Sequence, residues 1–380
     1  MPETFTHLGV YSDLVDTIRK ESTIYPLASP GEATRQMIRE VLGFTSLEPS
    51  PKDVRIEARW QGDGVAGEEV SWSTGYGPRT RAWVLKPVGT ERPLPGIVAL
   101  HGHDGIKFFG IEKIADGREP TPIEVKTLRA DLYEGRSFAN DLCKHGFIVL
   151  AHDVFLWGSR RFPYEVMPES VHRLVDNWLA AQTRRRPQPG EAELYDVAGR
   201  YHEHLVAKYC SLLGVSLAGI VNFEDRVAAK YLNSRPDVCP GPIGCIGLSG
   251  GGCRAALLQA TCDQIGAAAI VGMMSTYHEL LDHQVDCHTW MFFPPGIAHV
   301  GDWPDVAACR APSPVLVQYD RHDHLFPIKG MEAAHQRIAF HYEKAGRRDG
   351  YLGIFYDGPH KFDAAMQADA FAWLQTQLPR

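Results

Sequence analysis

The chain lacks the long apolar segment of a membrane protein. Its longest uncharged apolar run, residues 265–274, has ten residues including two glycines, about half of the roughly 20 that cross a bilayer. The first residues carry acidic side chains and show no basic start followed by an apolar stretch, so no signal peptide is indicated. We therefore expect a protein that is neither secreted nor bound to a membrane.

Cysteine and basic charge are also sparse. The eight cysteines stand singly, without the paired short spacings of a zinc site. We interpret them as reduced thiols and expect a cytoplasmic location. The 39 basic residues are outnumbered by 46 acidic ones, a net charge of −7, whereas nucleic-acid-binding proteins carry a clustered basic face. We expect no nucleic-acid partner.

The chain does contain strand and helix patterns in a regular order. A helical period closed by Gly43 is clearest at residues 32–42, and short alternating runs at 54–86 are typical of antiparallel strands. Compact apolar runs without alternation then predict strands buried on both faces of a parallel sheet, at residues 96–100, 147–151, 243–246, 267–271, 315–319 and 352–356. The segments between them fit crossover helices, at residues 138–145, 219–232, 253–261, 331–345 and 362–378.

These patterns predict an α/β fold: a mostly parallel sheet covered by helices over residues 51–380, preceded by a helical extension at 1–50. Residues from about 155 to 215 are rich in Arg, Pro and Glu and separate a strand from the next helix. We interpret them as an inserted cap over one end of the sheet. The extension is either a dimer arm or a lid, and homo-oligomer formation stays open.

The strongest chemical signal is Gly-Leu-Ser-Gly-Gly at residues 247–251, between an apolar run and a helix-compatible segment. In a G-x-S-x-G elbow the serine sits on a strained turn that needs small neighbours, and its hydroxyl faces the cleft. The pattern predicts Ser249 as a nucleophile; a plain Gly/Ser turn is the simpler interpretation.

A serine nucleophile needs a histidine base and an acid that orients it. Asp323 and His360 each follow a predicted strand, in the chain order Ser249, Asp323, His360 of an α/β-hydrolase. We predict these three as the catalytic residues. Asp320, closer to its strand end, is the lower-ranked alternative acid.

Acyl transfer also needs donors for the developing oxyanion. The loop at residues 101–105, His-Gly-His-Asp-Gly, follows the first buried strand, so we predict the backbone N–H groups of His103 and Gly250 as the oxyanion hole. A metal site built from His101, His103 and Asp104 is the alternative. It is disfavoured because the H-x-H-x-D-H pattern is off by one position. We expect no metal and no cofactor.

Together, the segments HGHDG (101–105), IGCIGLSGGG (243–252), DRHDHLFP (320–327) and GPHKF (358–362) resemble the dienelactone-hydrolase-like α/β-hydrolases, in particular their acetyl-xylan-esterase-like branch. The resemblance spans roughly residues 50 to 380 and implies a Ser-Asp-His esterase. Dienelactone hydrolase itself has cysteine at the elbow, where this chain has Ser249. We interpret Cys253, one helical turn on, as a packing residue.

Two aromatic loops are placed to contact a substrate. We predict Trp157, Trp290 and Phe292 as substrate-binding residues, with packing of the cap as the alternative role. Arginines in the cap could attract an acidic substrate, although solvated surface charge is the simpler interpretation; these are Arg160, Arg161 and Arg184, Arg185 and Arg186.

The sequence thus predicts a serine hydrolase that cleaves a small-molecule carboxylic ester, with a small acyl group or a carbohydrate, through an acyl-enzyme. A peptidase or amidase of the same fold is one alternative, although the residues before the domain are too few for a propeller. A non-catalytic binding protein of this fold is the other, because fold does not fix function.

Overall fold

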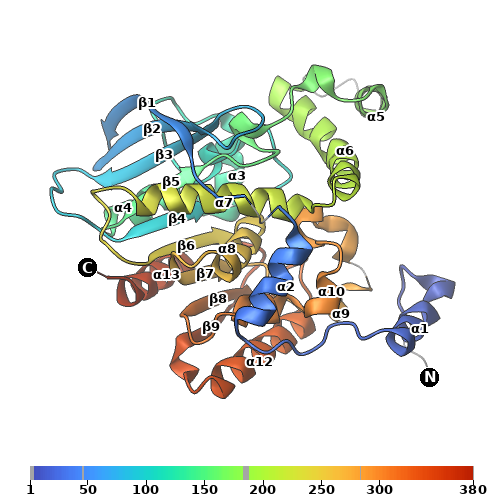
Figure 1. The fold of residues 1–380 in the computed structure, drawn as a ribbon. Coiled ribbons are helices and arrows are strands. Elements are labelled where there is room, and N and C mark those ends of the chain that lie inside the picture. The colour runs from blue at the N-terminus through green and yellow to red at the C-terminus, as the bar shows by residue number, and fades with distance from the viewer. Residues whose placement is uncertain (1–3, 45–46, 183–187, 283, 380) are drawn as a thin grey trace.

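The computed structural model describes residues 4–44, 47–182, 188–282 and 284–379. A nine-stranded sheet in the order β1-β2-β3-β5-β4-β6-β7-β8-β9 forms the centre of the molecule (Figure 1). Strands β1, β2, β3 and β5 pair with one another, in this order, in antiparallel fashion. From β5 onward, through β4, β6, β7, β8 and β9, neighbouring strands are parallel. The predicted meander and parallel sheet are therefore confirmed. The strands are β1 (Lys52–Gly62), β2 (Val65–Ser73), β3 (Thr80–Pro87), β4 (Gly96–Leu100), β5 (Ile148–His152), β6 (Ile243–Leu248), β7 (Ile265–Val271), β8 (Val315–Asp320) and β9 (Tyr351–Tyr356).

Helices cover both faces of the sheet (Figure 1). One apolar cluster joins α7, α8, α11 and α12 to one face, and a second joins α4 and α13 to the other. Along β4, Val98 and Leu100 belong to the first cluster, and Ile97 and Ala99 to the second. Both faces are buried, which explains why this strand shows no polar alternation. The helices are α1 (Asp13–Glu21), α2 (Glu32–Leu42), α3 (Ile123–Leu132), α4 (Phe138–Lys144), α5 (Glu169–Ala181), α6 (Glu191–Leu212), α7 (Leu217–Asn233), α8 (Gly250–Thr261), α9 (Tyr277–Leu280), α10 (Ile297–Val300), α11 (Trp303–Ala308), α12 (Ile328–Lys344) and α13 (Ala364–Gln377).

The two helices before the sheet differ in how they pack. In α1 only Val15 is buried, and this helix stands away from the body in Figure 1. In α2, Ile38 and Leu42 are fully buried and belong to the same apolar cluster as α7 and α8. The second helix is therefore part of the core.

The stretch assigned to a cap contains α5 and α6, which rise above one end of the sheet (Figure 1). They share a small apolar cluster of their own around Met167, Val171 and Tyr195. In the described residues no single helix is long and apolar enough to cross a bilayer; α6 and α7 reach that length and composition only as a pair bent by 87°.

Candidate active site

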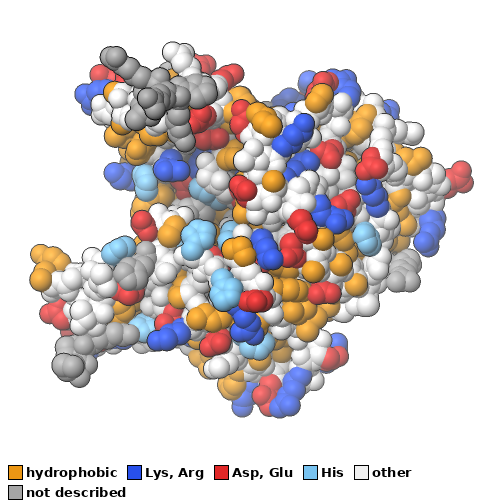
Figure 2. Space-filling model, turned by 180° about the vertical axis from the view of Figure 1, so that it is seen from behind, with side chains coloured by type: hydrophobic (Ala, Val, Ile, Leu, Met, Phe, Trp, Pro, Cys, Tyr) orange, Lys and Arg blue, Asp and Glu red, His pale blue; other side chains and the backbone are white. Residues whose placement is uncertain are grey.

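A cavity of about 460 Å³ opens where the loops after the parallel strands meet. Figure 2 shows histidine side chains gathered around a hollow beside a projecting lobe. The cavity is lined by His103, Asp104, Gly105, Leu128, Asp131, Leu132, Arg200, Ser249, Gly250, Cys253, Met273, Cys287, His288, Thr289, Phe292, His324, Leu325, Phe326 and His360.

Ser249 lies on a tight turn between β6 and α8. Its φ of +57° and ψ of −118° form a conformation that side chains rarely adopt, and its backbone N–H donates to the Val271 carbonyl at 2.8 Å. A methyl group at Gly251 would lie 2.1 Å from the Leu100 oxygen, and one at Gly247 would lie 2.5 Å from the Gly251 carbonyl carbon. The glycines are therefore required by the close approach of backbone around the serine.

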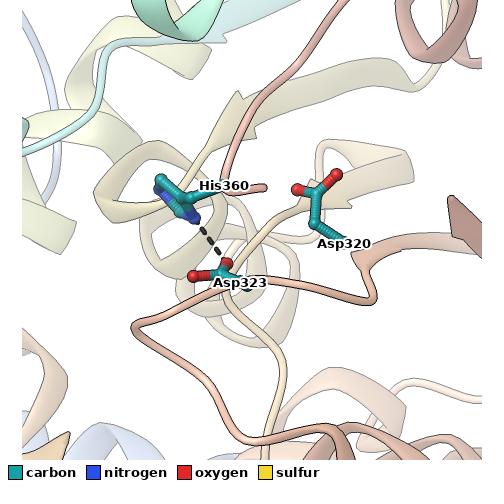
Figure 3. Close-up of side chains that lie close together, drawn as sticks. All are labelled: Asp320, Asp323 and His360. Carbon is teal, nitrogen blue, oxygen red and sulfur yellow. Dashed lines mark hydrogen bonds and ion pairs between the residues drawn. The ribbon is translucent and has the colours of Figure 1, made fainter. Parts of the chain in front are cut away.

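His360 and Asp323 form a hydrogen-bonded pair from two loops. His360 Nδ1 lies 2.6 Å from Asp323 Oδ2 (Figure 3), and the other carboxylate oxygen accepts the Leu325 N–H at 2.8 Å. Burial lowers the pKa of His360. The hydrogen bond and charge of Asp323, with the charges of Asp320 and Asp104, outweigh that effect and raise the pKa above 6.5. The pair is thus arranged to hold a proton on the imidazole.

Asp320 lies at the end of β8 beside this pair but does not bond the histidine (Figure 3). Its Oδ2 accepts the Lys361 N–H at 3.2 Å, and its buried Oδ1 has no hydrogen-bond partner. Burial is the main cause that raises the pKa of this carboxyl group to about 7. Asp323 is therefore the acid that contacts the histidine.

The two predicted oxyanion donors lie next to each other. A methyl group at Gly250 would lie 2.6 Å from the His103 backbone nitrogen, and within the described residues neither amide donates to another group. The buried Lys113 ammonium holds the loop from below, because it donates to the carbonyls of Gly102 at 2.5 Å and Ile106 at 3.1 Å. It also pairs with Asp104 at 3.1 Å. Two backbone N–H groups without a protein acceptor among the described residues thus lie close together, one on the loop after β4 and one at the start of α8.

Glu203, on α6, joins three segments around the cavity. One carboxylate oxygen lies 3.1 Å from His103 Nε2 and also accepts from the Lys107 ammonium. The other accepts from the Thr289 hydroxyl at 2.5 Å and from the Trp290 N–H at 2.8 Å. The charges of Lys107 and His103 overcome burial and hold the pKa of Glu203 well below its usual range. Helix α6 is therefore bound to the loop that carries His103 and Lys107 by an ionised carboxylate. No sequence motif signalled Glu203.

Of the three predicted substrate-binding residues, one lines the cavity and two do not. Phe292 lines the cavity. Trp157 is only 1% exposed and packs its ring against His103 and the Lys107 ammonium. Trp290 is exposed, but its indole N–H donates to His204 Nδ1 at 2.8 Å, away from the cavity. Neither tryptophan is among the residues that line the cavity of Ser249, whereas Phe292 is.

The cap arginines also take other roles. Arg160 is buried in an ion pair with Glu224, and Arg161 lies over the Phe108 ring at 4.2 Å. Arg184, Arg185 and Arg186 lie outside the described residues. The cation that does line the cavity is Arg200 on α6, which the sequence did not single out.

His288 and Phe326 also line the cavity beside Phe292. The His288 ring lies 4.6 Å from the Phe326 ring and 4.9 Å from the Phe292 ring. Burial is the main cause that lowers the pKa of His288 to about 4. This wall is thus aromatic and uncharged near neutral pH.

The side chains of the alternative metal site bind separate protein partners. His101 Nδ1 lies 3.1 Å from the Gly102 carbonyl, His103 contacts Glu203, and Asp104 pairs with Lys113. In the described part of the chain, the cluster with ligand atoms within 4.8 Å of one another is Asp320, Asp323 and His360, which is the acid–histidine pair with its neighbour. Among the described residues, His101, His103 and Asp104 therefore do not form a set of candidate metal ligands.

Comparison with known proteins finds one curated relative by sequence. No family model matches the chain. The curated protein "Putative hydrolase YtaP" of Bacillus subtilis (strain 168) is 25% identical over 298 residues, or 78% of this chain and 83% of that protein. The motif-based resemblance is thus matched by a relative described as a hydrolase.

Solved structures of esterases share the architecture. A "putative acetyl xylan esterase" from Bacteroides fragilis has a TM-score of 0.65 at 17% identity, covering 92% of this chain and 82% of its own. A glucuronoyl esterase from Solibacter usitatus has a TM-score of 0.59 at 13% identity, covering 90% and 91%. Acetyl xylan esterase 1 from Thermoanaerobacterium has a TM-score of 0.55 at 14% identity, covering 96% and 98%. The chain therefore has the α/β-hydrolase fold that these esterases share.

Proposed function

We propose that the protein is a serine esterase that cleaves a carboxylic ester of a small or carbohydrate-like molecule through an acyl-enzyme. One observation carries the proposal: Ser249, on its strained turn, and His360, bonded to Asp323, line the same cavity. The esterases that share the fold and the hydrolase relative support ester hydrolysis as the reaction.

The first half of the reaction forms the acyl-enzyme. Ser249 Oγ attacks the carbonyl carbon while His360 Nε2 takes the hydroxyl proton, and Asp323 holds Nδ1–H and stabilises the imidazolium. The backbone N–H groups of His103 and Gly250 donate to the oxyanion, with each donor worth about 3 to 4 kcal/mol. Collapse breaks the ester bond, and His360 returns the proton to the leaving alkoxide.

The second half repeats these steps with water. His360 removes a proton from water, the hydroxide attacks the acyl carbon, and the proton returns to Ser249 as the acid leaves. Cys253, which also lines the cavity, does not compete as nucleophile, because burial raises the pKa of its thiol far above neutral.

The test is hydrolysis of p-nitrophenyl acetate and butyrate by wild type, Ser249→Ala and the control Ser211→Ala, which removes an exposed hydroxyl of α6. We expect turnover to disappear only in Ser249→Ala, and a fluorophosphonate to label the wild type once, at Ser249, by mass spectrometry. Absence of both turnover and adduct would contradict the proposal and favour a non-catalytic binding protein.

The amidase alternative is tested on the same preparations. Aminoacyl p-nitroanilides replace the ester oxygen of the leaving group by nitrogen and keep the chromophore. We expect ester turnover without anilide turnover; efficient anilide hydrolysis would move the protein to the peptidase class.

A further inference from the structure

We propose that Arg200 selects esters that carry a carboxylate group, so that the physiological substrate is an acidic ester; this inference rests on the proposed esterase function. The side chain lies on the wall of the cavity that Ser249 and His360 share. A guanidinium is charged at every physiological pH and matches the two oxygens of a carboxylate.

The other charged groups of the cavity are mostly engaged with protein partners. Asp104 pairs with the buried Lys113, and His360 is bonded to Asp323. His103 contacts Glu203, and the His288 ring nitrogen lies 3.2 Å from the Leu325 carbonyl. Their charge is therefore compensated, or in His288 absent near neutral pH, and adds little attraction for an ion in the cavity.

Arg200 differs from these groups. The guanidinium is exposed and makes no hydrogen bond or ion pair with any described residue. The lining groups that are likewise without such partners are His324 and Asp131, both also exposed. The permanent charge available to a bound molecule is thus one cation on α6 and one carboxylate on α3.

The backbone of Arg200 is held firmly over the cavity. Glu203 lies three residues further along α6, on the same side of the helix, and binds the oxyanion loop and the 289–290 segment. The helix thus cannot move away without breaking these buried bonds. Arg200 therefore projects from a fixed point, which reduces the entropy lost when its side chain grips an anion.

The rest of the wall fits the remainder of such a molecule. Leu128 and Leu132 of α3, with Met273, Phe292 and Phe326, supply an apolar surface. A short acyl chain or a ring can pack there while a carboxylate reaches Arg200. An ester with one apolar part and one carboxylate is the substrate class that these contacts fit.

The experiment compares two pairs of esters that differ in one charge. p-Nitrophenyl hemisuccinate and butyrate place or omit the carboxylate on the acyl side, and 4-acetoxybenzoate and 4-acetoxybenzamide do so on the alcohol side. We expect the wild type to have the higher kcat/KM for the charged member of at least one pair. The preference should shrink when the salt concentration rises from about 0.05 M to about 0.5 M, because the attraction is screened.

Substitutions then assign the preference. Arg200→Gln should lower kcat/KM for the preferred charged ester about tenfold or more, the value of one charge-assisted hydrogen bond, and leave the neutral partner within about twofold. Arg200→Lys should retain part of the preference. Lys208→Gln removes an exposed cation of the same helix outside this cavity and should change nothing.

Two results would overturn the inference. The first is equal or better turnover of the neutral member in both pairs. The second is an equal fall in kcat/KM for charged and neutral esters in Arg200→Gln, with the same fall in Asp131→Asn. That result would mean that the two side chains maintain the shape of the cavity and do not bind a carboxylate. Failure of the esterase proposal itself is distinguishable, because all four esters would then remain intact and no serine would be labelled.

Discussion

Two aspartates three residues apart, Asp320 and Asp323, have different roles because their hydrogen-bond partners differ. Asp320 ends β8 and accepts one backbone N–H, with its second oxygen unpartnered. Asp323 lies further along the loop, where one oxygen accepts a backbone N–H and the other meets His360. Both carboxylates favour a protonated imidazole by their charge. Only Asp323 can also orient the ring, because orientation needs direct contact.

Substitution separates these two effects. Asp323→Asn should lower kcat by orders of magnitude, because the amide favours the wrong tautomer of His360. Asp320→Asn should retain most of the turnover. In the proposed mechanism the neutral form of His360 is the base, so wild-type kcat/KM should rise with pH through a pKa above 6.5. Removing the Asp320 charge lowers that pKa, so the acid limb should move to lower pH.

The measurement is a pH profile of kcat/KM for p-nitrophenyl acetate with the three proteins. A collapse of turnover in Asp320→Asn, with an active Asp323→Asn, would assign the acid to Asp320. A limb that moves to higher pH in Asp320→Asn would contradict the electrostatic account.

At the scale of elements, two buried charged side chains, Lys113 and Glu203, hold the loop at residues 102–107 in place. Lys113 holds the carbonyls of the 102–106 segment from the core side. Glu203 reaches the same loop from the cap helix α6 through His103 and Lys107. The amide of His103 is therefore positioned by side chains from two elements far apart in the sequence.

We predict that Glu203→Gln lowers kcat about tenfold with little change in KM. Without the Glu203 contact the His103 N–H shifts, which weakens its hydrogen bond to the oxyanion in the transition state but leaves binding of the ground-state ester unchanged. Stability should also fall, by about 3 kcal/mol, since the buried Lys107 charge loses its partner. Glu193→Gln, which changes an exposed acid of the same helix, is the control.

Steady-state kinetics and thermal unfolding together test this role. A fall in melting temperature at unchanged kcat in the folded Glu203→Gln protein would reduce Glu203 to a structural residue. A parallel rise in KM would mean that the carboxylate positions substrate instead of the oxyanion donor.

For the whole molecule, the two helices before the sheet, α1 and α2, differ in how much they contribute to the packed core. Arg35 of α2 donates to the Ala260 carbonyl of α8 at 2.8 Å, and the backbone of α2 approaches α7 so closely that a methyl group at Gly219 would lie 2.0 Å from the Leu42 oxygen. With Ile38 fully buried, α2 braces α8, the helix that follows Ser249. By contrast, α1 buries only Val15.

Two truncations follow from this difference. Removal of residues 1–21 should leave a folded protein with a moderately lower melting temperature, because Phe5 and Val15 of this segment are buried. Removal of residues 1–50 should expose the apolar cluster under α2 and yield insoluble protein. Ile38→Ala in the full chain should cost about 2 to 5 kcal/mol of the free energy of unfolding. Circular dichroism melts test all three; a stable protein lacking residues 1–50 would show that α2 is dispensable.

The sequence by itself determined the sheet and the elbow. Apolar runs such as residues 96–100 reveal strands because burial on both faces removes polar residues, and the glycines around Ser249 are imposed by local backbone crowding. The order of Ser249, Asp323 and His360 is likewise readable along the chain, because each follows a strand end.

Only the tertiary structure decided which side chains reach the cavity. Trp157 and Trp290 do not line the cavity, whereas Arg200 of α6 does, and Glu203 of the same helix contacts the cavity residue His103. The physical reason is that local patterns depend on burial and backbone sterics within a few residues. The partner of a polar or aromatic side chain on a loop or cap helix depends instead on how segments a hundred residues apart are packed.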